Sequence, residues 1–117
     1  MKDYIQKASR TNSNIYNIQD NEQLLHAGIG LATEAVEFLD ALKKSIFYGK
    51  KLDKVNLKEE LGDMLWYMAL AMKELDTDFN TEMKRNIEKL SARYPKKFSL
   101  EKSENRDIKT EREILEK

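Results

Sequence analysis

The chain has 117 residues, no cysteine, and 21 basic against 21 acidic residues, so its formal net charge is zero. This length corresponds to one domain; the zero net charge argues against a nucleic-acid-binding surface, and the absence of cysteine excludes disulfides and thiolate metal sites. No apolar run approaches the roughly 20 residues of a membrane span, and the N-terminal MKDYIQKASR lacks a signal-peptide core, so we expect a cytoplasmic protein with no membrane partner.

Helical periodicity dominates the chain, which has only four glycines and one proline and no alternating strand pattern. In chain order we expect a short helix at 2–9, a polar loop at 9–21, and long helices at 22–47, 57–75 and 79–94. Gly49 is a natural stop for the first long helix, and Pro95 ends the last one. Asn56, followed three residues later by Glu59, predicts a capping box at the start of the middle helix.

The connector at 48–56 is short, so the two helices that it joins should be antiparallel neighbours. The charged tail at 99–117 holds a few apolar residues and predicts a peripheral or subunit-bridging helix. The expected fold is therefore all-α, an antiparallel helical bundle. It forms a single domain over 1–117, with its core at about 20–98.

Two pairs of acidic residues are the most informative feature: Glu34 with Glu37, and Glu60 with Asp63. A step of three residues turns a helix by about 300°, so the carboxylates of each pair share one helix face. No lysine or arginine lies three or four residues from Glu34 or Glu37. Antiparallel packing would bring the pairs together, and carboxylates that converge repel one another unless a cation lies between them. Oxygen ligands favour Mg²⁺, or Mn²⁺, over zinc.

Two other interpretations compete with a magnesium site. Glutamates three residues apart are common on solvated helix faces, which is the ordinary explanation of a single pair. A di-iron carboxylate bundle needs Glu-x-x-His on two helices. The only histidine, His26, does not follow a glutamate at that spacing, so we expect it to be a packed or surface imidazole.

Polar and aromatic residues near the acids are candidate substrate contacts. Asn86, Lys89 and Arg93 share one face of the helix at 79–94, where they would receive a polyphosphate or merely form the wet side of an amphipathic helix. Tyr67 lies one turn beyond Asp63, where its ring would stack on a base, pack in the core or cap the site. Trp66 is expected to face another way, into the core or a subunit interface.

At these residues the chain resembles the MazG-like nucleotide pyrophosphohydrolases of the all-α NTP-PPase superfamily. The family signature is E-E-x-x-E and E-x-x-D on consecutive helices, followed by a helix that bears lysine and arginine. The matching segments are LLHAGIGLATEAVEFLDALKK, NLKEELGDMLWYMA and NIEKLSARYPKKF. The resemblance covers about 20–98, and the tail weakly. Thr33 stands where the family has the first glutamate.

The resemblance implies Mg²⁺-dependent hydrolysis of a (deoxy)nucleoside triphosphate between its α and β phosphates, giving a monophosphate and pyrophosphate. It makes Glu34, Glu37, Glu60 and Asp63 the metal ligands. Glu37 would take the proton of the attacking water, Lys89 and Arg93 would stabilise the leaving pyrophosphate, and the chain would form a homodimer or homotetramer. Two alternatives stay open: a related dUTP-, dCTP- or phosphoribosyl-ATP-hydrolysing enzyme, and a non-catalytic helical regulatory or interaction module.

Overall fold

The computed structural model describes residues 2–117, with side chains from residue 3 onward, and every regular element in that range is helical. The elements in chain order are α1 (Lys2–Ser9), η1 (Gln19–Asn21), α2 (Glu22–Tyr48), α3 (Lys54–Glu74), α4 (Phe79–Arg93), α5 (Leu100–Glu104) and α6 (Ile108–Glu116). The all-α prediction is thereby confirmed, and the three long helices match their expected ranges to within a few residues. None of the described helices is long and apolar enough to cross a membrane.

The ends of the long helices follow from local hydrogen bonding. After α2, Gly49 adopts the left-handed conformation at φ 68°, as predicted, and its N–H donates to the carbonyl of Lys44. The predicted capping box at Asn56 is wrong, because α3 begins earlier. The side chain of Asp53 accepts hydrogen bonds from the backbone N–H groups of Val55 and Asn56, at 3.0 and 3.1 Å. A carboxylate at the N-cap satisfies these otherwise unpartnered donors, so the first turn forms before Asn56.

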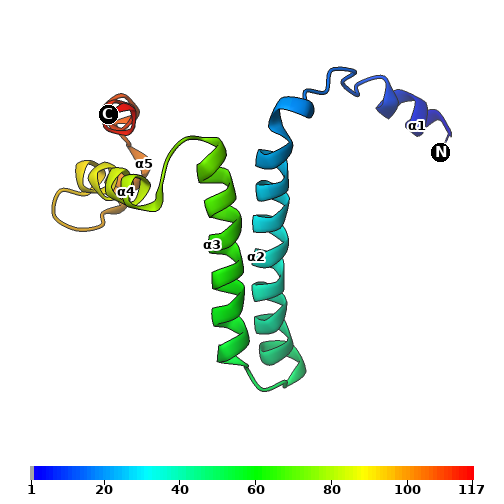
Figure 1. The fold of residues 1–117 in the computed structure, drawn as a ribbon, viewed down its shortest axis with the longest axis horizontal. Helices are drawn as coiled ribbons and strands as arrows, with labels where there is room; N and C mark the ends of the chain where they lie inside the picture. Colours follow the sequence, from blue (N-terminus) through cyan, green and yellow to red (C-terminus); the bar gives the residue numbers. More distant parts are fainter. Residues whose placement is uncertain (1) are drawn as a thin grey trace.

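Helices α2 and α3 form an antiparallel hairpin. Figure 1 shows them side by side, joined at one end by a short connector. The helices are in close contact at Gly30, where an added Cβ would overlap the ring of Tyr67. Glu37, seven residues after Gly30 on α2, meets Glu60, seven residues before Tyr67 on α3. Contacts repeated every seven residues are the geometry of coiled-coil-like packing, and they fix how the two acidic pairs face each other.

The tail contains two helices rather than one, and α6 packs across α4. The contact depends on Glu111 of α6, whose side chain is buried between two arginines. It accepts hydrogen bonds from Arg93 of α4, at 2.7 Å to Nε, and from Arg106, at 2.6 Å to Nη2. The expected peripheral helix is thus attached to α4 through an ion-pair network centred on Glu111.

The single chain is open rather than closed around one core. Its radius of gyration is 19.9 Å, against about 13 Å for a compact domain of this length. In Figure 1, α4 leaves the end of α3 and leads away from α2. Leu61 and Leu65 of α3 and Leu75, just after its end, are 50 to 61% exposed, so they do not lie in a core of the single chain. The described residues therefore form an antiparallel hairpin and an α4–α6 unit, and do not close into one bundle within a chain.

Candidate metal centre

Three carboxylates from the two hairpin helices converge where the sequence predicted an acidic site. Oxygen atoms of Glu34 and Glu37 on α2 and of Glu60 on α3 all lie within 4.8 Å of one another. Glu60 is buried, Glu34 is half-buried and Glu37 is exposed. The cluster thus has a closed side formed by the helix seam and an open side at Glu37.

The electrostatics of this cluster are unfavourable without a cation. The Oε2 atoms of Glu34 and Glu60 are buried and have no hydrogen-bond partner among the described residues. The adjacent carboxylate of Glu34, then burial, then the charge of Glu37, raise the pKa of Glu60 to about 7. A buried, unpartnered carboxylate oxygen is costly. These residues fit a hard divalent cation, because carboxylate oxygens are the ligands that Mg²⁺ and Mn²⁺ prefer.

Asp63 and Thr33 stand at the edge of the cluster. Asp63 lies outside the three-carboxylate group but lines an open pocket of about 390 Å³ together with Glu34. Thr33 occupies the position of the family's first glutamate, and its hydroxyl donates to the carbonyl of Gly30 at 3.0 Å. The Thr33 hydroxyl therefore forms a hydrogen bond within its own helix, and it does not replace the missing carboxylate.

The pocket beside Asp63 has aromatic walls, Trp66 and Tyr67. Their rings meet edge to face, with centroids 5.0 Å apart, and His26 packs edge-on against both. The expectation that Trp66 faces away from the site is wrong, since it lines the same pocket as Tyr67 and is 59% exposed. The aromatic wall of the site therefore includes a residue that helical spacing alone did not place there.

On the other side of the cluster a second pocket, of about 310 Å³, opens toward the connector. Glu37 and Glu60 form one wall, and Lys44, Lys50 and Lys51 are among the other lining residues. Lys44 pairs with Asp40 at 2.8 Å. The sequence interpretation missed these lysines, although the Gly-Lys-Lys step that ends α2 placed two of them beside the predicted acidic site.

The basic residues predicted on the third helix lie on α4, apart from the acids of the same chain. About 20 Å of helix separates Glu60 from Glu74 at the end of α3, and α4 begins beyond that end (Figure 1). Lys89 is half-buried and Asn86 is exposed. One chain therefore brings Glu34, Glu37 and Glu60 together, but does not bring Asn86, Lys89 or Arg93 to them.

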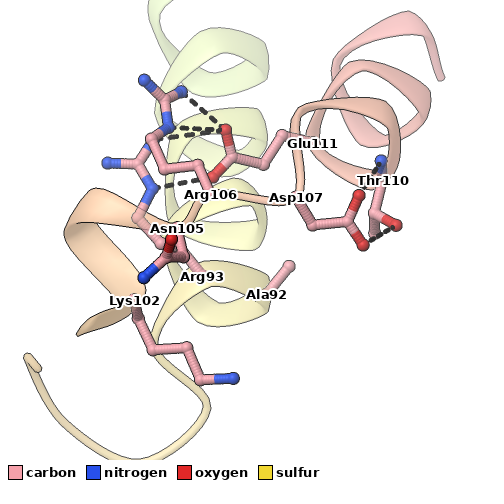
Figure 2. A pocket seen from close by; sticks show the side chains of 8 residues that line it. All are labelled: Ala92, Arg93, Lys102, Asn105, Arg106, Asp107, Thr110 and Glu111. Atoms are coloured by element: carbon pink, nitrogen blue, oxygen red, sulfur yellow. Dashed lines mark hydrogen bonds and ion pairs between the residues drawn. The ribbon is translucent and has the colours of Figure 1, made fainter.

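Arg93 is held by the tail, as Figure 2 shows. Glu111, only 3% exposed, accepts hydrogen bonds from Nε and Nη2 of Arg93, at 2.7 and 3.3 Å. Arg106 binds the same carboxylate from its other side. Arg93, followed by Arg106, lowers the pKa of Glu111 to about 2. Two arginines sharing one carboxylate keep a net positive charge, and the sequence contained no spacing signal for this network.

The comparisons with known proteins identify the family of the chain. Residues 19–98 match the model of the MazG nucleotide pyrophosphohydrolase domain. The chain is also 35% identical over 77 residues to the Gene 37 protein of Mycobacterium phage L5, covering 62% of this chain and 67% of the phage protein. No solved structure matches the chain significantly. The matched segment holds both acidic pairs and the whole of α4, and the chain belongs to the MazG nucleotide pyrophosphohydrolase domain family.

Proposed function

We propose that the protein is a Mg²⁺-dependent nucleoside triphosphate pyrophosphohydrolase that cleaves a (d)NTP between the α and β phosphates, releasing (d)NMP and pyrophosphate. The observation that supports this most is the cluster of Glu34, Glu37 and Glu60, with two buried oxygens that lack partners, inside a MazG domain. Hydrolysis of a phosphoric anhydride depends mainly on charge neutralisation and positioning, and a carboxylate cage for a divalent ion meets the first requirement.

Each carboxylate has a role consistent with its exposure. Glu34 and Glu60 are the less exposed pair and would hold the ion from the helix seam, with Asp63 completing the set from α3. A bound Mg²⁺ supplies charge neutralisation and lowers the pKa of water in its vicinity. Glu37 is exposed on the open side, where a water can reach it. We propose that Glu37 is the general base that accepts a proton from the attacking water, because a general base must lie within hydrogen-bond reach of the water it activates.

We propose that a second copy of the chain completes the site, in a homodimer or homotetramer. Leu61, Leu65 and Met68 of α3, and Leu75 at its C-cap, recur every three, four or seven residues and are 36 to 61% exposed. An apolar face of this length requires a partner, and the open shape of the chain leaves room for one. Closure of two hairpins against each other would produce the predicted antiparallel bundle. It would also bring α4, with Asn86, Lys89 and Arg93, near the phosphates.

The tail belongs to the same domain in this proposal. Glu111 of α6 binds Arg93 of α4, a residue of the third family motif that we assign to substrate binding. Because the two side chains are 4% and 14% exposed, their separation would leave buried charge without a partner. The segment 99–117 is thus part of a single domain over 1–117, with the family core at 19–98.

A non-catalytic helical module is the competing function, and a panel of nucleotides distinguishes it from an enzyme. Magnesium-dependent pyrophosphate release is measured over all NTPs and dNTPs, including dUTP and dCTP, and phosphoribosyl-ATP. Wild type and Glu59→Gln, an exposed neighbour on α3, should release pyrophosphate from at least one nucleotide, and Glu60→Gln should not. Absence of release from every nucleotide favours the non-catalytic module, and full activity of Glu60→Gln contradicts the metal site.

A further inference from the structure

We propose that the nucleotide lies along the α2–α3 hairpin with its phosphate tail toward the connector at 49–53, where Lys50 and Lys51 contact the β and γ phosphates. The base then lies at the opposite end, against Trp66. This inference rests on the proposed function and adds the direction of the bound substrate and two substrate-binding residues. It follows from the two pockets that flank the acidic cluster.

The order of groups along the hairpin sets the direction. Glu37 and Glu60 line the pocket on the connector side, whereas Glu34 and Asp63 line the pocket on the far side. Glu34 and Asp63 lie farther from the connector than Glu37 and Glu60, because Glu34 precedes Glu37 on α2 and Asp63 follows Glu60 on the antiparallel α3. A metal held by the acids therefore lies between a pocket with lysines and a pocket with aromatic rings.

The connector pocket has cations available for phosphate. Lys44 is paired with Asp40, but neither Lys50 nor Lys51 forms an ion pair among the side chains described from residue 3 onward. Asp53, another lining residue, accepts two backbone N–H groups as the cap of α3. An ammonium group on a flexible stem suits a phosphate oxygen as a point charge. These two lysines do not depend on a second subunit, unlike Lys89 and Arg93.

The aromatic pocket has the opposite character. Its lining residues are Glu34, Asp63, Trp66 and Tyr67, with no lysine or arginine among them. A polyphosphate placed there would extend past the metal along a wall with no lysine or arginine, whereas a base would stack on an exposed indole ring. Stacking on an aromatic side chain is tolerant of base identity and stabilises binding. The reverse direction of the nucleotide is therefore disfavoured at both ends.

The test uses the two reaction products as separate probes of the two ends. Binding of inorganic pyrophosphate and of a nucleoside monophosphate is measured by calorimetry in Mg²⁺ for wild type, the double variant Lys50→Gln/Lys51→Gln, and Trp66→Ala. The matched control is Lys54→Gln/Lys58→Gln, which removes the same charge from exposed positions outside both pockets. The full-length chain is used throughout, and its helical content is checked by circular dichroism.

We expect each variant to weaken the binding of only one of the two products. Loss of Lys50 and Lys51 weakens pyrophosphate binding by about tenfold or more, because charged hydrogen bonds are lost, and leaves the monophosphate unaffected. Trp66→Ala weakens the monophosphate and leaves pyrophosphate unaffected. The proposal is overturned if the lysine variant weakens the monophosphate and Trp66→Ala weakens pyrophosphate. It is also overturned if the Lys54/Lys58 control has the same effect as the Lys50/Lys51 variant, or if wild type does not bind pyrophosphate. If wild type releases pyrophosphate from a nucleotide while the lysine variant binds it normally, the direction is wrong and the enzymatic function stands.

Discussion

The carboxylates of Glu34 on α2 and Glu60 on α3 place oxygen atoms within 4.8 Å of each other, and the Oε2 atom of each is buried with no hydrogen-bond partner among the described residues. Like charges at this separation cannot both be ionised at low cost, which is why the pKa of Glu60 rises to about 7. A divalent cation between them removes that cost. The packing of the two helices thus creates a cluster of carboxylates that a divalent ion would stabilise.

Divalent-ion binding should depend on Glu60 more than on Asp63. Glu60→Gln removes a member of the cluster and should weaken Mn²⁺ binding on the order of 100-fold or more, beyond the 10- to 100-fold typical of outer-shell changes. Asp63→Asn should have a smaller effect, because Asp63 lies at the rim. Mn²⁺ titration followed by electron paramagnetic resonance measures both. Glu59→Gln serves as the control, and equal affinities for it and Glu60→Gln would contradict the assignment.

The helices were largely predictable because their boundaries depend on local signals. Gly49 ends α2 in the left-handed conformation that favours glycine, as its position after a periodic segment indicated. The start of α3 was misplaced because Asp53 and Asn56 are both good caps, and only the structure shows that Asp53 accepts the bonds. Periodicity also identifies the apolar face of α3, with Leu61 and Leu65, but does not identify which chain covers it.

Gly30 should be intolerant of a side chain because the ring of Tyr67 occupies the space of its Cβ. Gly30→Ala should lower the free energy of unfolding by about 1–3 kcal/mol, the usual cost of overpacking. Gly28→Ala meets nothing within 4 Å and should raise it by about 0.5–1 kcal/mol, the helix preference of alanine. Urea unfolding at one fixed protein concentration measures both. Stabilisation of similar size by the two substitutions would mean that α2 and α3 do not meet at Gly30.

Leu65 should contribute to assembly rather than to the core of one chain, since it is 51% exposed on the apolar face of α3. Leu65→Glu should convert a dimer or tetramer into a monomer, because a charge placed in an apolar interface loses its hydration. Light scattering coupled to size-exclusion chromatography measures the mass against 13.7 kDa for one chain. Lys58→Glu on the same helix is the control. A wild-type protein that remains monomeric at high concentration would show that no second copy covers this face.

The tail network should make stability depend on pH in the acidic range. The pKa of Glu111 falls from 4.5 to about 2 because Arg93 and Arg106 stabilise its carboxylate. A group with a lowered folded-state pKa stabilises the fold above its unfolded pKa, and this contribution is lost as pH falls from about 4.5 toward 2. The melting temperature of wild type should exceed that of Glu111→Gln at pH 7, and the difference should shrink below pH 4.5. A difference that stays constant to pH 3 would contradict an ionised Glu111 in the folded protein.

The acidic part of the site was predictable and its surroundings were not. Glu34, Glu37 and Glu60 follow from helical spacing and a short connector, both of which are local features. Glu111 reaches Arg93 across 18 positions of sequence through the packing of α6 on α4, which no local spacing encodes. The lysines of the connector were missed because loop residues carry no periodicity, although they line the same pocket as two of the acids.

Identification of the products formed from a nucleoside triphosphate with and without Mg²⁺ tests the proposed reaction most directly. Nucleotides are separated by ion-exchange chromatography and pyrophosphate is quantified enzymatically in the same samples. We predict equal amounts of monophosphate and pyrophosphate, formed only with the divalent ion. The Glu60→Gln variant, which removes the buried carboxylate of the cluster, should form neither product. Formation of a diphosphate and orthophosphate, or product formation that is unaffected by chelation of the ion, would contradict a carboxylate-held metal that directs cleavage between the α and β phosphates.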